Sequence, residues 1–143
     1  MKSLLTAFIS VFVFSSAWAA SAASLDCKSS GGDFEMDAVI SLASGDLMQN
    51  SLTITAAKTQ KTATAKQYMN YDDHLFVIAS LGPQKGTTDA GYVIDVEKES
   101  EDSDPNAPVS YSGSAQKYSE DQPGHRVVDS NSQMDISCTA TPP

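Results

Sequence analysis

The chain has 143 residues, which is the size of a single domain, and carries 9 basic and 18 acidic side chains, for a formal net charge of −9 at pH 7. This balance argues against a nucleic-acid-binding protein, because phosphates are held by lysine and arginine. It equally disfavours binding to an anionic membrane surface. A basic partner is compatible with the charge, although acidity on its own indicates mainly solubility.

The first 22 residues have the three parts of a secretory signal peptide. Lys2 supplies the positive start, residues 4–14 form an apolar core too short to span a bilayer, and small residues follow. The small residues allow cleavage after residue 19 or after residue 22. We therefore predict a mature domain over 23–143, periplasmic or secreted, with no membrane span after cleavage. Loss of Lys2 leaves 8 basic against 18 acidic residues.

The only two cysteines, Cys27 and Cys138, lie near the two ends of the predicted mature chain. An even cysteine count without metal-type spacing, in an exported protein, predicts a disulfide. The bond would close almost the whole domain into one loop. It also predicts that the first and last strands lie side by side.

Apolar and polar residues alternate along much of the chain, which is typical of strands with one buried face. A continuous apolar run, residues 75–79, predicts the most buried strand. The alternating stretches are residues 35–42, 52–56, 92–97 and 134–138, with shorter candidates at 109–111 and 126–128.

Glycine- and proline-containing turns separate these stretches, so the sequence predicts an all-β fold. We expect a small antiparallel β-sandwich or β-barrel of roughly 7–8 strands, closed by the disulfide between its N- and C-terminal strands. Residues 56–69 are ambiguous. Their alanines and lysines would suit a helix, but three threonines and the alternation of Thr62, Thr64, Lys66 and Tyr68 favour a hairpin.

The acidic segment around EDSDPN places Asp102, Asp104 and Asn106 at alternating positions, as at the start of a calcium-binding loop. Counted from Asp102, however, the sixth position is Ala107 and the twelfth is Gly113, where an EF-hand has glycine and glutamate. We favour a solvated acidic loop and expect no cofactor. A looser calcium site on these three residues is the alternative.

Other polar residues suit structural roles. His74 and His125 occupy predicted turns, and two histidines without a free cysteine make a poor zinc site. Lys58, Lys61 and Lys66 would gather near one hairpin tip as a basic patch. Lysines also protect edge strands from aggregation, which is the interpretation we favour.

Sequence motifs of catalysis are absent: the chain has no nucleophile elbow, no phosphate-binding loop and no HExxH helix. A thin core leaves little room for a deep cleft. We therefore expect a protein that is not an enzyme.

The segment YSGSAQKY, residues 111–118, resembles the serine-glycine-aromatic loop of the periplasmic C-type lysozyme inhibitors. Those proteins are also small, exported, disulfide-containing β-barrels. The resemblance implies a partner-binding loop that uses Tyr111, Ser112, Ser114 and Tyr118. The chain departs from the family in lacking its tryptophan-lysine-glycine segment, because the only tryptophan, Trp18, lies in the signal peptide.

Together these features predict an exported β domain with a non-catalytic binding role, whose partner is an unknown protein or envelope component. The net charge is compatible with a basic partner. Two alternatives stay open. One is an inhibitor of a basic cell-wall hydrolase, and the other is a calcium-dependent structural or adhesion module.

Overall fold

The computed structural model describes residues 22–41, 44–71, 73–99, 104 and 106–143. Nearly all of the described chain is strand and turn. No helix in these ranges is long and apolar enough to cross a membrane. The elements are β1 (Ala22–Ser29), β2 (Phe34–Ser41), β3 (Thr53–Ala56), β4 (Thr59–Thr62), β5 (Thr64–Tyr71), β6 (His74–Ser80), β7 (Asp89–Lys98), β8 (Val109–Gln122), β9 (His125–Val128), the 3-10 turn η1 (Ser130–Ser132) and β10 (Met134–Thr141).

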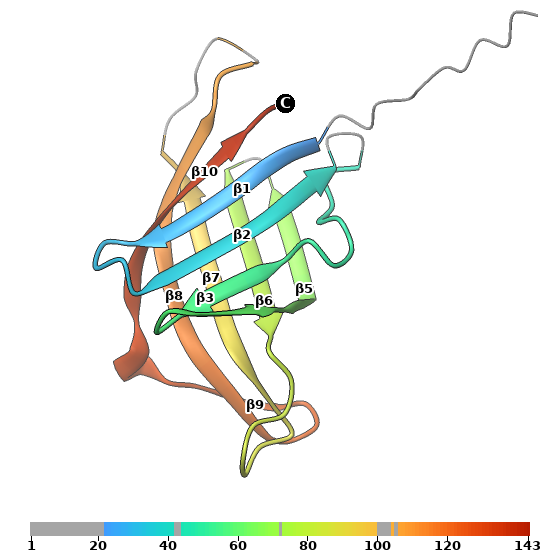
Figure 1. Ribbon diagram of the computed structural model, residues 1–143, viewed down its shortest axis with the longest axis vertical. Coiled ribbons are helices and arrows are strands. Elements are labelled where there is room, and N and C mark those ends of the chain that lie inside the picture. Colours follow the sequence, from blue (N-terminus) through green and yellow to red (C-terminus); the bar gives the residue numbers. More distant parts are fainter. Residues whose placement is uncertain (1–21, 42–43, 72, 100–103, 105) are drawn as a thin grey trace, which may run out of the picture.

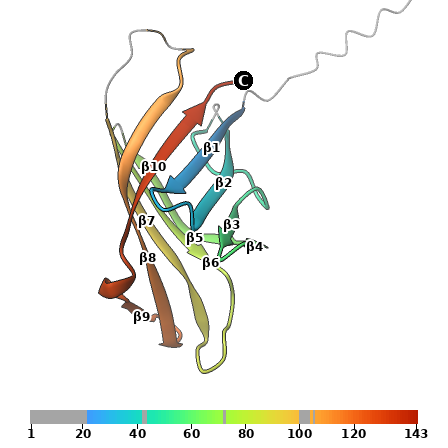
Figure 2. The same ribbon diagram turned by 60° about the vertical axis from the view of Figure 1, so that its left-hand side comes forward.

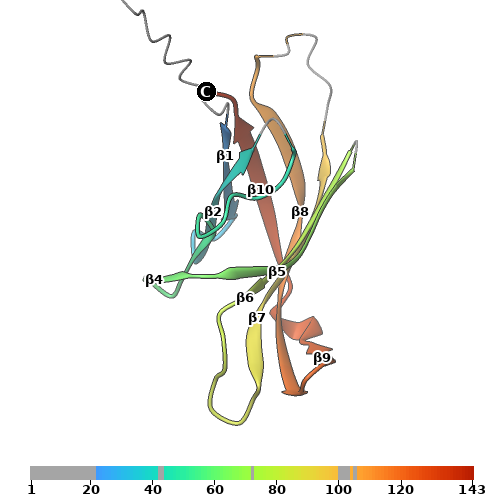
Figure 3. The ribbon, with the colours of Figure 1, turned by 90° about the vertical axis from the view of Figure 1, so that its right-hand side faces the viewer.

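The strands form one antiparallel sheet that curls into a half-barrel (Figure 1), so the predicted all-β antiparallel class is confirmed. The order is β4-β3-β2-β1-β10-β8-β7-β6-β5, and β9 pairs with β8 outside this path. Figures 2 and 3 show β1 and β2 facing β5 to β8 across the curl. The sheet has ten strands rather than seven or eight. Part of the difference arises because residues 53–71 divide into three strands.

The two ends of the sheet order, β4 and β5, follow each other in the chain with only Ala63 between them. Ala63 is buried, and its backbone N–H donates to the carbonyl of Leu52 at 2.9 Å. The chain before this point pairs with β3, and the chain after it pairs with β6. One bent stretch of chain therefore connects the two layers, as at the corners of other curled sheets.

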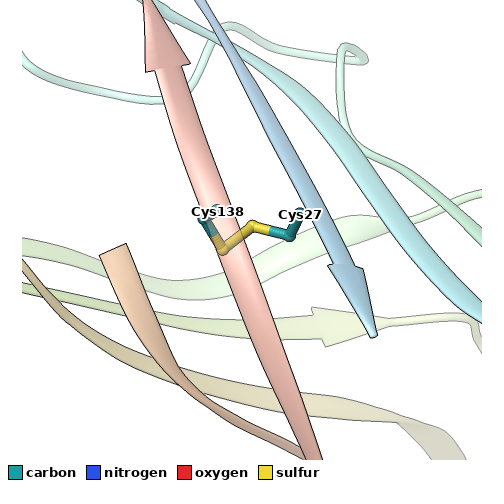
Figure 4. Close-up of a disulfide and its surroundings, with 2 residues drawn as sticks. All are labelled: Cys27 and Cys138. Atoms are coloured by element: carbon teal, nitrogen blue, oxygen red, sulfur yellow. A yellow bond between two sulfur atoms is a disulfide. The ribbon is translucent and has the colours of Figure 1, made fainter. Parts of the chain in front are cut away.

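The disulfide is present where the sequence predicted it, between the first and last strands (Figure 4). Cys27 and Cys138 are directly opposite each other in the β1–β10 ladder, with Cα atoms 4.0 Å apart. Both side chains are buried in the concave core. The bond thus fixes the register of the two strands that join the N- and C-terminal parts of the chain.

The core fills the concave face, and the alternation of the sequence determines which residues reach it. In β2 every second residue from Phe34 to Ile40 is buried. Phe34 packs across the curl against Tyr92 of β7, with ring centroids 4.8 Å apart. The strand predicted to be the most buried, residues 75–79, lies in β6, and four of these five residues are buried: Leu75, Val77, Ile78 and Ala79.

The ambiguous segment forms a hairpin, as favoured from its threonines, with a two-residue turn at Ala57 and Lys58. Both turn residues have positive φ angles, 48° and 63°. Such a turn prefers Asn-Gly, because other residues are strained in the left-handed region.

We therefore expect the Ala57→Asn Lys58→Gly variant to be more stable by about 1 kcal/mol, a gain readable in a urea titration. The same pair of replacements, asparagine then glycine, at Thr59 and Gln60 in β4 is the control and should destabilise. A variant at 57–58 no more stable than the parent would contradict the turn geometry.

Candidate functional site

A pocket of about 360 Å³ opens on the concave face, where β7 and β8 emerge from beneath the β3–β4 hairpin. Figure 3 shows these two strands continuing beyond the layer formed by β1 to β4. The pocket walls are mainly apolar and its rim is polar. The lining residues are Ile54, Ala56, Thr59, Lys61, Leu81, Gln84, Ala90, Gly91, Tyr92, Lys117 and Tyr118.

Two lysines reach this pocket from opposite layers. Lys61 of β4 is directly opposite Ile54, and Lys117 of β8 is directly opposite Tyr92. Residues opposite each other in an antiparallel ladder share a face, so both lysines lie on the same face as buried core residues. Neither has an ion-pair partner among the described residues.

Tyr92 lines the pocket while its ring packs on Phe34. Burial raises the pKa of the Tyr92 hydroxyl, so this group stays a neutral donor. It has no hydrogen-bond partner in the part of the chain that is described. None of the described lining residues is an acid, a histidine or a cysteine. The pocket thus offers hydrogen-bond donors and positive charge over an apolar surface, without the carboxylates or imidazoles of acid–base chemistry.

A second polar arrangement lies on the opposite face of the same strands. Asp89 of β7 and Glu120 of β8 are paired directly in the ladder and are only 5% and 3% exposed. They are the two buried charged side chains in the described ranges. Like charges at such positions are destabilising unless cations compensate them.

Lys66 and Arg126 supply the compensating charges. Lys66 Nζ is 2.5 Å from Asp89 Oδ2 and 3.5 Å from Glu120 Oε2, and Arg126 Nη2 is 3.2 Å from Glu120 Oε1. Lys66 reaches the pair from a β-bulge, where the β5–β6 register shifts between Ala65 and Gln67. The bulge turns this one side chain out of the regular alternation.

Two hydroxyl groups also donate hydrogen bonds to the Asp89 carboxylate. Ser80 Oγ donates to its Oδ1 at 2.5 Å and Tyr118 Oη donates to its Oδ2 at 2.8 Å. Burial alone would raise the pKa of Asp89, but the hydrogen bonds from Lys66, Ser80 and Tyr118 outweigh it and lower this pKa to about 2. Burial and the bond to Asp89 raise the pKa of Tyr118, which remains a donor. Asp89 is therefore ionised at neutral pH.

The Tyr118 ring covers this network. It lies opposite Gly91, where a Cβ atom would sit 1.9 Å from the Ala79 carbonyl oxygen and 3.0 Å from the ring. Arg126 stacks on the ring, 5.0 Å from its centroid. We refer to Lys66, Ser80, Asp89, Tyr118, Glu120 and Arg126 as the charge network. Its groups satisfy one another, and their contacts connect β5, β6, β7, β8 and β9.

The segment predicted as a partner-binding loop is not a loop, because residues 111–118 lie inside strand β8. Tyr111 is buried on the concave face, opposite Cys138, whereas Tyr118 is buried on the other face. Ser112 is exposed and Ser114 is partly buried. The two aromatic rings therefore do not form one exposed surface, which removes the loop that the resemblance to lysozyme inhibitors implied.

The calcium candidates are only partly described. Asp102 lies outside the described residues, and Asn106 donates its backbone N–H to Asp104 Oδ1 at 2.9 Å. Asn106 and Tyr111 both line a second pocket of about 380 Å³ at the other end of the half-barrel. No group of three or more histidine, cysteine, aspartate or glutamate side chains suited to a metal ion occurs among the residues described.

The remaining candidates are dispersed. His74 begins β6 and contacts Asp95, and His125 begins β9 and contacts Asp121, all four being exposed side chains. The three lysines predicted to form one basic patch lie in different places. Lys58 is in the hairpin turn, Lys61 faces the pocket and Lys66 belongs to the charge network.

Comparisons with known proteins identify no relative: no family model, no curated protein and no solved structure matches this chain.

Proposed function

We propose that this protein is an exported, non-catalytic binding domain that holds a small envelope or extracellular molecule in the concave pocket. The observation that carries the proposal is the pocket itself, in which apolar walls converge with two lysines and the Tyr92 hydroxyl that lack partners among the described residues. A concave, mostly apolar surface with a few convergent polar groups is the usual form of a ligand site.

Export is supported by the signal-like residues 1–22 and by the buried disulfide, which persists in oxidising compartments. Cleavage after residue 19 would leave β1 complete, and cleavage after residue 22 would remove only its first residue, Ala22. The absence of acids and histidines from the described pocket lining supports binding rather than turnover.

The two alternatives receive less support. A hydrolase inhibitor would need an exposed binding segment, but Tyr111 and Tyr118 are buried on different faces of β8. A calcium-dependent module rests on Asp102, Asp104 and Asn106, and the contacts described there amount to a local turn. A thermal melt in calcium and in chelator still separates this alternative, because a bound ion must raise the melting temperature.

The binding proposal is tested by nuclear magnetic resonance on the labelled mature protein, residues 23–143. We expect backbone amide shifts at Ala90, Tyr92 and Lys117 when pools of small neutral, cationic and anionic molecules are added. The Ala90→Phe variant, which fills the pocket, should abolish the shifts. Shifts centred on Ser112 and Ser114 instead, unaffected by Ala90→Phe, would contradict the proposal and restore the predicted partner surface.

A further inference from the structure

We infer that the concave pocket selects a small amphipathic anion, a molecule with an apolar body and one acidic head group, which Lys61 and Lys117 hold at the rim. This inference rests on the proposed binding function and adds the chemical class of the ligand. The apolar body would contact Ile54, Leu81 and Ala90.

The distribution of cations in this acidic protein is the first argument. Lys28, Lys66 and Arg126 have acidic partners, and Lys98 has an interaction of its own. The other lysines of the described chain have no ion-pair partner there, and two of them face the same pocket. Unpaired positive charges at a shared cavity attract an anion and repel a cation. The members of this unpaired set are Lys58, Lys61, Lys85 and Lys117.

The position of Lys117 is the second argument. Lys61 lies on β4, an end strand of the sheet order, where a lysine also serves to protect a free edge. Lys117 lies within β8, paired to β7, and its register places it on the inward face next to Tyr92. Inward positions of a curled sheet are ordinarily apolar, as Ala115 is on the same strand. Edge protection does not account for a lysine within β8, and because Lys117 is exposed beside Tyr92 its ammonium group is available to an anionic ligand.

The shape of the pocket is the third argument. Its volume of about 360 Å³ is near the lower end of ligand sites, which suits one small molecule rather than a polymer segment. The apolar walls lie deep, on Ile54 and Tyr92, and the lysines are exposed at the rim. A ligand therefore enters with its apolar part first and leaves its charge beside the ammonium groups.

The test uses two fluorescent probes with the same aromatic body, anilinonaphthalene sulfonate, which is an anion, and phenylnaphthylamine, which is neutral. We expect the mature oxidised protein to bind the anion more tightly. In the Lys61→Gln Lys117→Gln variant its Kd should rise about tenfold, while that of the neutral probe stays unchanged. Added salt should weaken the binding of the anionic probe and leave the binding of the neutral probe unchanged.

The Lys28→Gln Lys58→Gln variant is the control, since it makes the same change in net charge outside the pocket lining and should leave both Kd values unaltered. Near-ultraviolet circular dichroism of every variant checks that the domain is folded before the probes are added. Ala90→Phe should reduce binding of both probes.

Each outcome decides a separate point. Equal binding of both probes, insensitive to the lysine replacements but lost in Ala90→Phe, would overturn the anion inference and leave the binding function intact. Anion binding that survives Ala90→Phe would place the probe elsewhere and overturn the inference. No binding of either probe, with no amide shifts in the magnetic resonance titration, would overturn both proposals.

Discussion

Removal of the disulfide is expected to produce the largest loss of stability in this protein. The bond closes a loop of 111 residues, and a loop of that length corresponds to about 4 to 5 kcal/mol of unfolded-state entropy. We expect the Cys27→Ala Cys138→Ala variant to lose about that much free energy of unfolding, which lowers the melting temperature by roughly 10–20 °C.

Urea titrations of the oxidised parent and of this variant measure the effect. Because the cross-link keeps the unfolded chain compact, the variant should also show a steeper dependence of the free energy of unfolding on urea. Intact mass of the untreated mature protein should be lower by two hydrogens than that of the reduced protein. Two titratable thiols in the native, untreated protein would contradict the bond.

The second large effect is expected from Lys66. Its replacement by methionine leaves Asp89 and Glu120 opposite each other in the ladder, with Arg126 as the one compensating cation among the described residues. Breaking a fully buried ion pair costs about 3 to 5 kcal/mol. Since the Lys66 side chain is 38% exposed, we expect a smaller loss, about 2 kcal/mol.

The matched control is Lys61→Met, on β4, the strand that precedes β5 in the chain. Lys61 lacks an acidic partner among the described residues, so its replacement should change stability by less than about 0.5 kcal/mol. The Lys66→Met Asp89→Asn variant should recover part of the loss, because it removes the charge left unpaired. If Lys66→Met is no more destabilising than Lys61→Met, the network does not hold these strands.

The charge network also determines how stability responds to acid. The pKa of Asp89 is about 2 in the folded protein and near 3.8 when unfolded, so the folded state binds the proton less readily. Its contribution, on the order of 2 kcal/mol, is present above pH 4 and is lost as the pH falls toward 2. Urea titrations of the parent and Asp89→Asn should diverge above pH 4 and converge at low pH.

How far the sequence alone predicts this fold is clearest in β2, β7 and β10. In each, a period of two predicted which side chains are buried, and Cys138 falls on the buried face, where a disulfide to the first strand requires it. This pattern is reliable because one face of each strand is determined locally by the alternation of residues.

The charge network was not predicted, because alternation assigns Asp89, Tyr118 and Glu120 to the outward face, where polar residues are ordinary. The structure covers that face locally with the Tyr118 ring and with Arg126. One feature of the sequence did indicate that this outward face is covered. The continuous apolar run of β6 includes Ile78, which is buried on the outward face beside this network and indicates that both faces of the strand are covered.

Local alternation and the presence of only two cysteines were enough to predict the all-β class, the faces of the strands and the pairing of Cys27 with Cys138. That Lys61 and Lys117 line one pocket and that Lys66 reaches Asp89 could be learned only from the folded chain. The curl of the sheet, the bend at Ala63 and the bulge after Ala65 bring these side chains together, and their separation along the chain carries no information about that distance.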